Sequence, residues 1–291
     1  MNSTVKRAVG HAMYRRRRLR QRFRSFVIGG HDTSKAVWIT SWQRSGSTWL
    51  AEMLASPRRT RFIYEPANIP DRCFEGARAA KIAPPLISIP HASAIVKSLE
   101  GTTTHWWSDQ FNNSHKPKRL VAKDVRGLGV AGNVADQLEE MPIIILIRNP
   151  IDVATSIIRL GWFDPELSAH DAFVAEVSRW CDYHERALKD ERLSRALWVS
   201  YEALQADPTE QLTAIRTYLL TFSKTWNALN VAALDTTRRS ATDFSDQIGE
   251  TVAPEWITQA RAVLERSVFG AVYAAHAPVA LTELVDSVRA R

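Results

Sequence analysis

The fold is decided by residues 143–150, which read IIILIRNP. Five consecutive aliphatic residues, four of them isoleucine, are typical of a strand buried on both faces of a parallel sheet. Pro150 suits the first turn of a helix, and Val153, Ile157 and Leu160 then recur at helical spacing. A buried strand followed at once by an amphipathic helix is the repeating unit of α/β proteins, so we expect a parallel sheet.

Strands and helices alternate along the rest of the chain as well. Apolar runs that predict strands occupy 36–40, 62–64, 120–122 and 196–199, and helical patterns occupy 48–55, 131–140 and 168–189. We therefore predict an α/β protein with a central parallel sheet flanked by helices. Residues 67–118 contain prolines, asparagines and little periodicity, which indicates an irregular insertion with short helices. The expected division is a basic arm at 1–34 and one domain at 35–291.

Composition narrows the class of protein. The chain has 291 residues and a formal net charge of +7, which favours an anionic partner such as a nucleotide, an acidic glycan or a membrane surface. Cys73 and Cys181 are far apart and lack neighbouring ligands, which excludes a disulfide framework and a recognisable zinc site. No stretch approaches the roughly 20 apolar residues of a membrane-spanning helix. We expect a soluble, cytoplasmic protein.

Much of the positive charge lies in one segment, residues 15–24, which contain seven arginines. In a helix, the apolar residues of this segment and its surroundings would share one stripe: Leu19, Phe23, Phe26 and Val27. Two interpretations remain open, a solvated or packed arm, and a peripheral membrane or polyanion contact through residues 11–27. The segment lacks the interleaved aromatic residues of a nucleic-acid stacking platform, so no nucleic-acid partner is expected.

A polar loop joins the first predicted strand to the first predicted helix. Residues 41–50 read SWQRSGSTWL, and such a turn directs free backbone N–H groups and the positive end of a helix at one point, which suits an anion. The loop holds a cation, Arg44, and a glycine, Gly46, that permits close approach. Three hydroxyl groups can donate hydrogen bonds: Ser45, Ser47 and Thr48. The Walker A ending is missing, which disfavours an ordinary nucleoside triphosphatase, and a polar turn with a helix cap remains the alternative.

A second candidate anion site follows the strand at 143–147. Arg148 stands at the carboxyl end of that strand, where open α/β sheets bind ligands, and its forked guanidinium suits a phosphate. Ser156 lies eight residues on, about two helical turns, so it can meet the anion that Arg148 holds. The alternative is that Arg148 only pairs with Asp152.

Together the two loops resemble the signatures of the PAPS-dependent sulfotransferase family, where PAPS is 3′-phosphoadenosine-5′-phosphosulfate. The resemblance covers roughly residues 36–205, including the order of the loops. It implies that residues 44–49 bind the 5′-phosphosulfate and that Arg148 and Ser156 bind the 3′-phosphate. It also implies the P-loop-nucleotide-kinase-like sulfotransferase fold.

Three further assignments follow from the same resemblance. Trp49 matches a position whose ring stacks on adenine, and Lys123 matches a lysine beside the transferred group. Tyr201 lies in residues 199–204, which are similar to a Tyr-Glu-Asp-Leu element near the nucleotide, although Ala203 replaces the aspartate here.

The sequence departs from the family pattern at two further positions. Arg44 stands where many members have lysine, a pattern similar to carbohydrate-modifying branches. Val125 stands where the cytosolic small-molecule branch has the histidine that accepts the proton, so that base is missing. Many members close a C-terminal basic element over the 3′-phosphate, and Arg238 and Arg239 are the candidates for it in this chain.

Glu65 is our choice of general base. It follows the strand at 62–64 on the edge that carries both loops, and the Tyr-Glu-Pro sequence there resembles carbohydrate and bacterial sulfotransferases with a glutamate base. A partly buried carboxylate between a substrate and cations can have the tuned pKa that proton transfer requires. Glu65 could instead only pair with Arg44 or a helix end, and Asp124 is the second candidate base.

The sequence therefore predicts a sulfotransferase that moves the sulfuryl group of PAPS to an acceptor hydroxyl and releases 3′-phosphoadenosine-5′-phosphate (PAP). We expect in-line displacement without a metal, since Arg44 and Lys123 can supply the positive charge. The resemblance favours a carbohydrate or glycolipid acceptor. Two other functions remain open: a non-catalytic binding module that uses its basic arm on a polyanion or membrane, and a nucleotide kinase.

Overall fold

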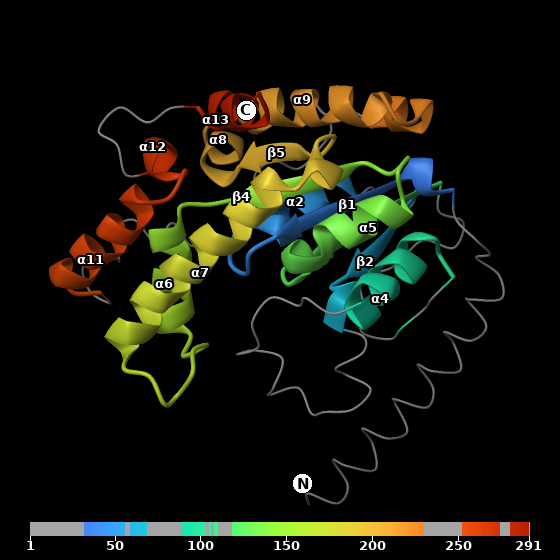
Figure 1. Ribbon diagram of the computed structural model, residues 1–291. Helices are drawn as coiled ribbons and strands as arrows, with labels where there is room; N and C mark the ends of the chain where they lie inside the picture. Colours follow the sequence, from blue (N-terminus) through green and yellow to red (C-terminus); the bar gives the residue numbers. More distant parts are fainter. Residues whose placement is uncertain are drawn as a thin grey trace, which may run out of the picture.

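The computed structural model describes residues 32–55, 59–68, 89–102, 105, 108–109, 118–229, 252–273 and 280–290. Its centre is a five-stranded sheet in the order β2-β3-β1-β4-β5, and all neighbouring pairs are parallel (Figure 1). The strands are β1 (Ala36–Ser41), β2 (Thr60–Tyr64), β3 (Arg119–Asp124), β4 (Ile143–Ile147) and β5 (Leu197–Ser200). Each strand overlaps a run predicted from the sequence, and the predicted fold class is confirmed.

Helices cover both faces of the sheet. On one face lie α4 (Ile89–Leu99), α5 (Ala131–Gln137), α7 (Ala169–Lys189), α11 (Pro254–Glu265) and α13 (Leu281–Arg289), and on the other α2 (Ser47–Leu54), α8 (Tyr201–Ala206) and α9 (Pro208–Leu220) (Figure 1). The remaining helices are α6 (Pro150–Arg159), α12 (Gly270–Tyr273) and the short 3-10 helices η1 (Thr33–Lys35), η2 (Pro66–Asn68), η4 (Gly127–Val130), η5 (Glu191–Leu193) and η6 (Lys224–Ala228). The alternating residues of β4 divide between the two cores, which explains its uninterrupted apolar sequence.

Strand order determines where a ligand can bind. The chain leaves β1 toward β2 on one side, returns to β3, and then crosses to β4 and β5 on the other side of β1. The connections after β1 and β4 therefore diverge from adjacent strands, and open α/β sheets bind ligands in the crevice at such a point. Both predicted anion loops follow these two strands.

The helix after β4 is shorter than the sequence pattern suggested. Val153 and Ile157 are buried as expected, but Leu160 is 44% exposed. The helix ends at Arg159, and Gly161 has a φ of 62°, so the chain turns away before Leu160 can reach the core.

The predicted division into arm and insertion falls largely outside the described residues. Only 32–34 of the arm are described, and the described part of the predicted insertion includes α4. This helix buries Ala92, Ile95 and Leu99 in the main core, so it belongs to the body of the protein. Within the described ranges, no helix combines the length and apolar character needed to cross a bilayer.

Candidate active site

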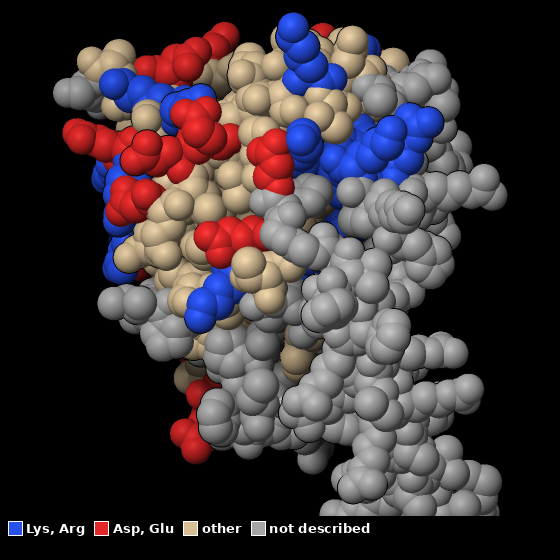
Figure 2. All heavy atoms as spheres, turned by 90° about the vertical axis from the view of Figure 1, so that its right-hand side faces the viewer, with Lys and Arg blue, Asp and Glu red and all other residues tan. Residues whose placement is uncertain are grey.

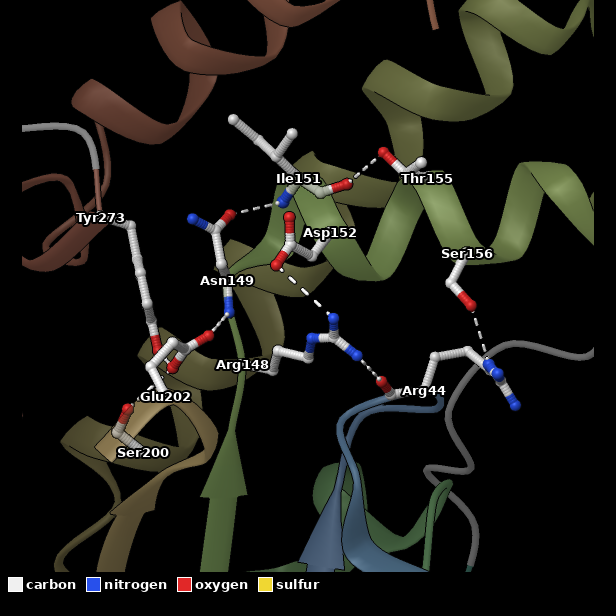
Figure 3. Close-up of polar contacts among 10 residues, drawn as sticks. All are labelled: Arg44, Arg148, Asn149, Ile151, Asp152, Thr155, Ser156, Ser200, Glu202 and Tyr273. Carbon is white, nitrogen blue, oxygen red and sulfur yellow. Dashed lines mark hydrogen bonds and ion pairs between the residues drawn. The ribbon is translucent and has the colours of Figure 1, made fainter. Parts of the chain in front are cut away.

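The two predicted anion loops lie side by side. Ser41 at the end of β1 pairs with Leu146 near the end of β4, so both loops leave the same edge of the sheet. Nη1 of Arg148 donates to the carbonyl oxygen of Arg44 at 3.4 Å, and Nε of Arg44 donates to Oγ of Ser156 at 2.9 Å (Figure 3). Burial and then the charge of Arg148 lower the pKa of Arg44. Two cations and a hydroxyl from separate loops therefore converge on one site, which suits a ligand with several negative charges.

The backbone of the first loop turns sharply toward the helix that follows. Arg44 has a φ of 66° and Gly46 a φ of 87°. A Cβ atom on Gly46 would lie 2.5 Å from the Tyr201 ring, so both the left-handed backbone and the close packing require glycine. Oγ of Ser45 is buried and has no hydrogen-bond partner among the described residues. A hydroxyl donor with no acceptor among the described residues, beside the start of α2, fits the predicted anion site of this loop.

An aromatic pair lies beneath the two loops. The Arg148 guanidinium carbon is 4.5 Å from the centroid of the Tyr201 ring, and Trp49 packs edge-on against Tyr201 at 5.8 Å between centroids. Trp49 is only 3% exposed. Its predicted stacking on adenine stays a prediction, and in this structure its ring packs in the core.

Arg148 also contacts the acid that the sequence offered as its alternative partner. Nη2 of Arg148 lies 3.6 Å from Oδ2 of Asp152, one turn into α6 (Figure 3). The same guanidinium reaches the first loop through Nη1. The ion pair therefore orients Arg148 toward the site while leaving its contact with Arg44 in place.

Glu65 and Lys123 form an ion pair at the ends of two neighbouring strands. Nζ of Lys123 lies 2.7 Å from Oε1 of Glu65 and 4.1 Å from the centroid of the Tyr64 ring. The predicted alternative of a Glu65–Arg44 pair is not what the structure shows. Glu65 has a φ of 46°. In the described ranges, Glu65 and Arg44 are the two non-glycine residues whose φ is positive. Such backbone conformations are concentrated at functional sites, and both residues were predicted to be catalytic.

Comparison with known proteins decides the family. The profile of the sulfotransferase family matches residues 36–221, a span that contains β1 to β5 and both loops. The chain belongs to the sulfotransferase family. The resemblance predicted from the two loops is thereby confirmed.

Several solved structures are similar to this sulfotransferase. The sulfotransferase domain from the curacin biosynthetic pathway is 16% identical, with 79% of this chain and 96% of that chain covered and a TM-score of 0.44. The sulfotransferase from Alicyclobacillus acidocaldarius is 16% identical, with the same coverage and a TM-score of 0.43. Mouse sulfotransferase SULT7A1 complexed with PAP is 13% identical, with 90% of each chain covered and a TM-score of 0.45. A search of curated proteins found no match.

The second candidate base of the sulfotransferase, Asp124, is fully buried. Its two carboxylate oxygens accept hydrogen bonds from the backbone nitrogens of Ala67, at 2.7 Å, and Arg126, at 2.8 Å. Burial and then the nearby charge of Glu65 raise the pKa of Asp124 to about 6. Asp124 therefore stabilises the turns that follow β2 and β3, and its position does not favour direct contact with a substrate.

A carboxylate missed by the sequence analysis holds the second loop. Oε1 of Glu202 accepts a hydrogen bond from the backbone nitrogen of Asn149 at 2.8 Å, and Oε2 accepts from Ser200 Oγ at 2.7 Å and Tyr273 Oη at 3.4 Å (Figure 3). The Asn149 side chain in turn caps α6 by accepting from the Ile151 nitrogen at 2.9 Å. Glu202 lies in residues 199–204, the segment similar to a Tyr-Glu-Asp-Leu element, whereas no sequence signal marked Tyr273.

Another missed carboxylate holds the first loop. Oε1 of the buried Glu176, in α7, accepts a hydrogen bond from the Trp42 indole at 2.6 Å and a longer one from the Gln43 amide at 3.5 Å. Its other oxygen forms an ion pair with Arg179. Because α7 packs against the sheet through a separate apolar stripe, Glu176 ties the loop to a rigid element.

Two further predictions concern the basic element at Arg238 and Arg239 and the expected absence of a metal. Arg238 and Arg239 lie outside the described residues, so their contact with a 3′-phosphate stays a prediction. In the described part of the chain, no three His, Cys, Asp or Glu side chains cluster as metal ligands would.

Proposed function

We propose that this sulfotransferase uses PAPS to sulfate an acceptor hydroxyl, with its two anion loops holding opposite ends of the nucleotide. The convergence of Arg44, Arg148 and Ser156 carries this proposal. Arg148 and Ser156 would bind the 3′-phosphate. The 5′-phosphosulfate would lie on the start of α2. There the Ser45 hydroxyl, which has no hydrogen-bond partner among the described residues, and the absence of a Cβ at Gly46 favour close approach of an anion.

The proposed reaction is an in-line displacement at sulfur. A bond forms between the acceptor oxygen and sulfur while the bond between sulfur and the phosphate oxygen breaks, and PAP leaves. Glu65 accepts the acceptor proton, and Arg44 and Lys123 balance the charge that develops on the leaving phosphate. The 2.7 Å ion pair between Glu65 and Lys123 supports this assignment because it holds a base and a cation at one point.

The acceptor we propose is a hydroxyl group of a carbohydrate or glycolipid. Support comes from Arg44 and from the Tyr-Glu-Pro sequence at 64–66, both similar to carbohydrate-modifying sulfotransferases. A glycolipid acceptor is compatible with a cytoplasmic protein that contacts the membrane surface through residues 11–27. Both the location and this contact remain predictions.

Sulfate transfer from radiolabelled PAPS to a panel of acceptors tests the function. Glu65→Gln keeps the size and polarity of the side chain but removes the base, so we expect transfer to fall at least a hundredfold while PAP binds about as tightly as before. Full activity in Glu65→Gln would overturn the assignment of the base. PAP binding without transfer to any acceptor would instead favour the binding module, and binding of ATP with magnesium in preference to PAP would favour a kinase.

A further inference from the structure

Basic side chains gather at the edge of the sheet opposite the nucleotide loops. Figure 2 views the molecule from the side where η1 and the start of β1 lie, and it shows Lys and Arg side chains massed on one part of this face. Five described cations lie near the starts of β2 and β3 and on α9 and η6, which meet at this corner: Arg59, Lys118, Arg119, Arg216 and Lys224. Arg59 precedes β2, and its carbonyl oxygen accepts hydrogen bonds from the backbone nitrogens of Lys118 and Arg119 at 2.8 and 3.2 Å. β3 spans six residues, roughly 20 Å, so this corner is remote from the nucleotide loops.

Arg119 is unusual because it is a buried charge with no counter-charge among the described residues. It is 2% exposed, and its guanidinium carbon lies 5.2 Å from the centroid of the Trp226 ring. None of the five cations makes an ion pair with a residue that the structure describes. Burial, and then the charge of Arg59, lower the pKa of Arg119. Buried charges are normally paired, so this arrangement is costly unless an anion joins it.

The same corner contains several buried donors that lack an acceptor in the part of the chain that the structure describes. Four buried atoms have no hydrogen-bond partner among the described residues: Thr60 Oγ1, Arg119 Nη1, Arg216 Nε and Trp226 Nε1. Thr60 and Arg119 are direct partners across β2 and β3, and Arg216 donates to Asn227, the residue after Trp226, at 2.8 Å. Three of these four atoms can only donate, so the missing group is an acceptor.

We propose that this corner binds a tetrahedral oxyanion, a phosphate or sulfate group, with Arg59 and Arg119 as its principal ligands. Arg59 is exposed and gives the anion access, while the Arg119 guanidinium is held in place by Trp226. Lys118 and Lys224 are also exposed and add positive potential around the site. The group can be a free ion or part of a phospholipid headgroup or sulfated glycan, because the chemistry of recognition is the same.

Calorimetric titration of the full chain with inorganic phosphate and sulfate, at constant ionic strength and with PAP in excess, tests the site. We expect saturable binding that Arg59→Gln weakens about tenfold. Arg261 is an exposed arginine on α11, on the side of the molecule away from the start of β1 (Figure 1), so Arg261→Gln is the matched control and should bind as the unaltered chain does. Because Arg59 is exposed, its substitution leaves the core intact, and Arg119→Met then tests the buried partner while keeping an apolar stem.

The proposal is overturned if the unaltered chain shows no saturable binding, or if both Arg59→Gln and Arg119→Met bind phosphate as it does. Flotation with phosphatidylglycerol vesicles and binding to a sulfated oligosaccharide distinguish the sources. If Arg59→Gln and Arg119→Met both bind one of these ligands more weakly than Arg261→Gln does, that ligand carries the oxyanion that the site recognises. If only inorganic phosphate binding is weakened, the ligand is the free ion. None of these variants alters the two anion loops. If PAP fails to bind to the unaltered chain and to all the variants alike, the result counts against the proposed function and not against the oxyanion site.

Discussion

The two predicted anion loops are both braced by a carboxylate, but in different ways. Glu176 holds the first loop through the side chains of Trp42 and Gln43 and has its own cation, Arg179. Glu202 holds the second loop through the Asn149 backbone and is itself held by hydroxyl groups. Side-chain bracing depends on the residues of the loop, whereas backbone bracing does not. The first loop should therefore be the more sensitive to changes in its own sequence.

Gly46→Ala should have the largest effect on the first loop. The new Cβ would lie 2.5 Å from the Tyr201 ring on a backbone with a φ of 87°, so the loop must shift. We expect PAP affinity to fall at least about a hundredfold by calorimetry. Gly161→Ala is the matched control, because its φ is 62° but its Cβ would meet nothing within 4 Å. It should lower the free energy of unfolding by about 1 kcal/mol and leave PAP binding unchanged; equal losses in both variants would contradict the packing explanation.

Acid should weaken the support beneath the first loop. His184 packs against Trp42 at 6.0 Å between ring centroids, and burial lowers its pKa to about 3. The unfolded chain takes up this proton near pH 6.5 and the folded chain only near pH 3, so the stability from neutral His184 is lost as pH falls through that window. At pH 5 the loss should be about 2 kcal/mol.

Chemical denaturation at pH 7.5 and pH 5, with the unaltered chain and His184→Gln, measures this effect. The variant should lose about 2 kcal/mol less between the two pH values than the unaltered chain does. The raised pKa of Asp124 makes the folded protein more stable as the pH falls, which opposes the effect of His184. This contribution is the same in both proteins, so the comparison cancels it. An identical pH dependence in the two proteins would rule out His184 as the cause.

Substitutions at Glu202, which braces the second loop, and at its partner Tyr273 should have smaller effects on PAP binding. Glu202→Gln keeps an acceptor for the Asn149 nitrogen but removes the charge, so we expect about tenfold weaker PAP binding with little change in the turnover of bound substrate. Tyr273→Phe removes only the 3.4 Å hydrogen bond and should weaken PAP less than threefold. Steady-state kinetics of each variant, which give the KM for PAPS and kcat separately, measure these effects. A fall in kcat at constant KM would show that Glu202 acts on the chemical step instead.

Local sequence patterns predicted the strands and the loops that follow them. They did not predict contacts between residues that are distant in the sequence. The five strands and both loops follow from runs of apolar residues and the polar turns after them. The contact of Glu202 with Asn149 joins residues 53 positions apart, and that of Glu176 with Trp42 joins residues 134 apart. No periodicity carries such information, because it arises only when α7 and α8 pack on the sheet. The ion pair of Glu65 with Lys123 was not predicted for the same reason, since Lys123 becomes the neighbour of Glu65 only through the pairing of β2 with β3.

The proposed function requires that the second loop bind the 3′-phosphate of the nucleotide whose 5′-phosphosulfate lies on the first loop. Calorimetric affinities of PAP and adenosine 5′-phosphate, which lacks the 3′-phosphate, test it in the unaltered chain and in Arg148→Ala. We predict that the unaltered chain prefers PAP by about a hundredfold and that Arg148→Ala loses most of this preference while binding adenosine 5′-phosphate almost as before. An unchanged preference for PAP in Arg148→Ala would show that Arg148 does not bind the 3′-phosphate.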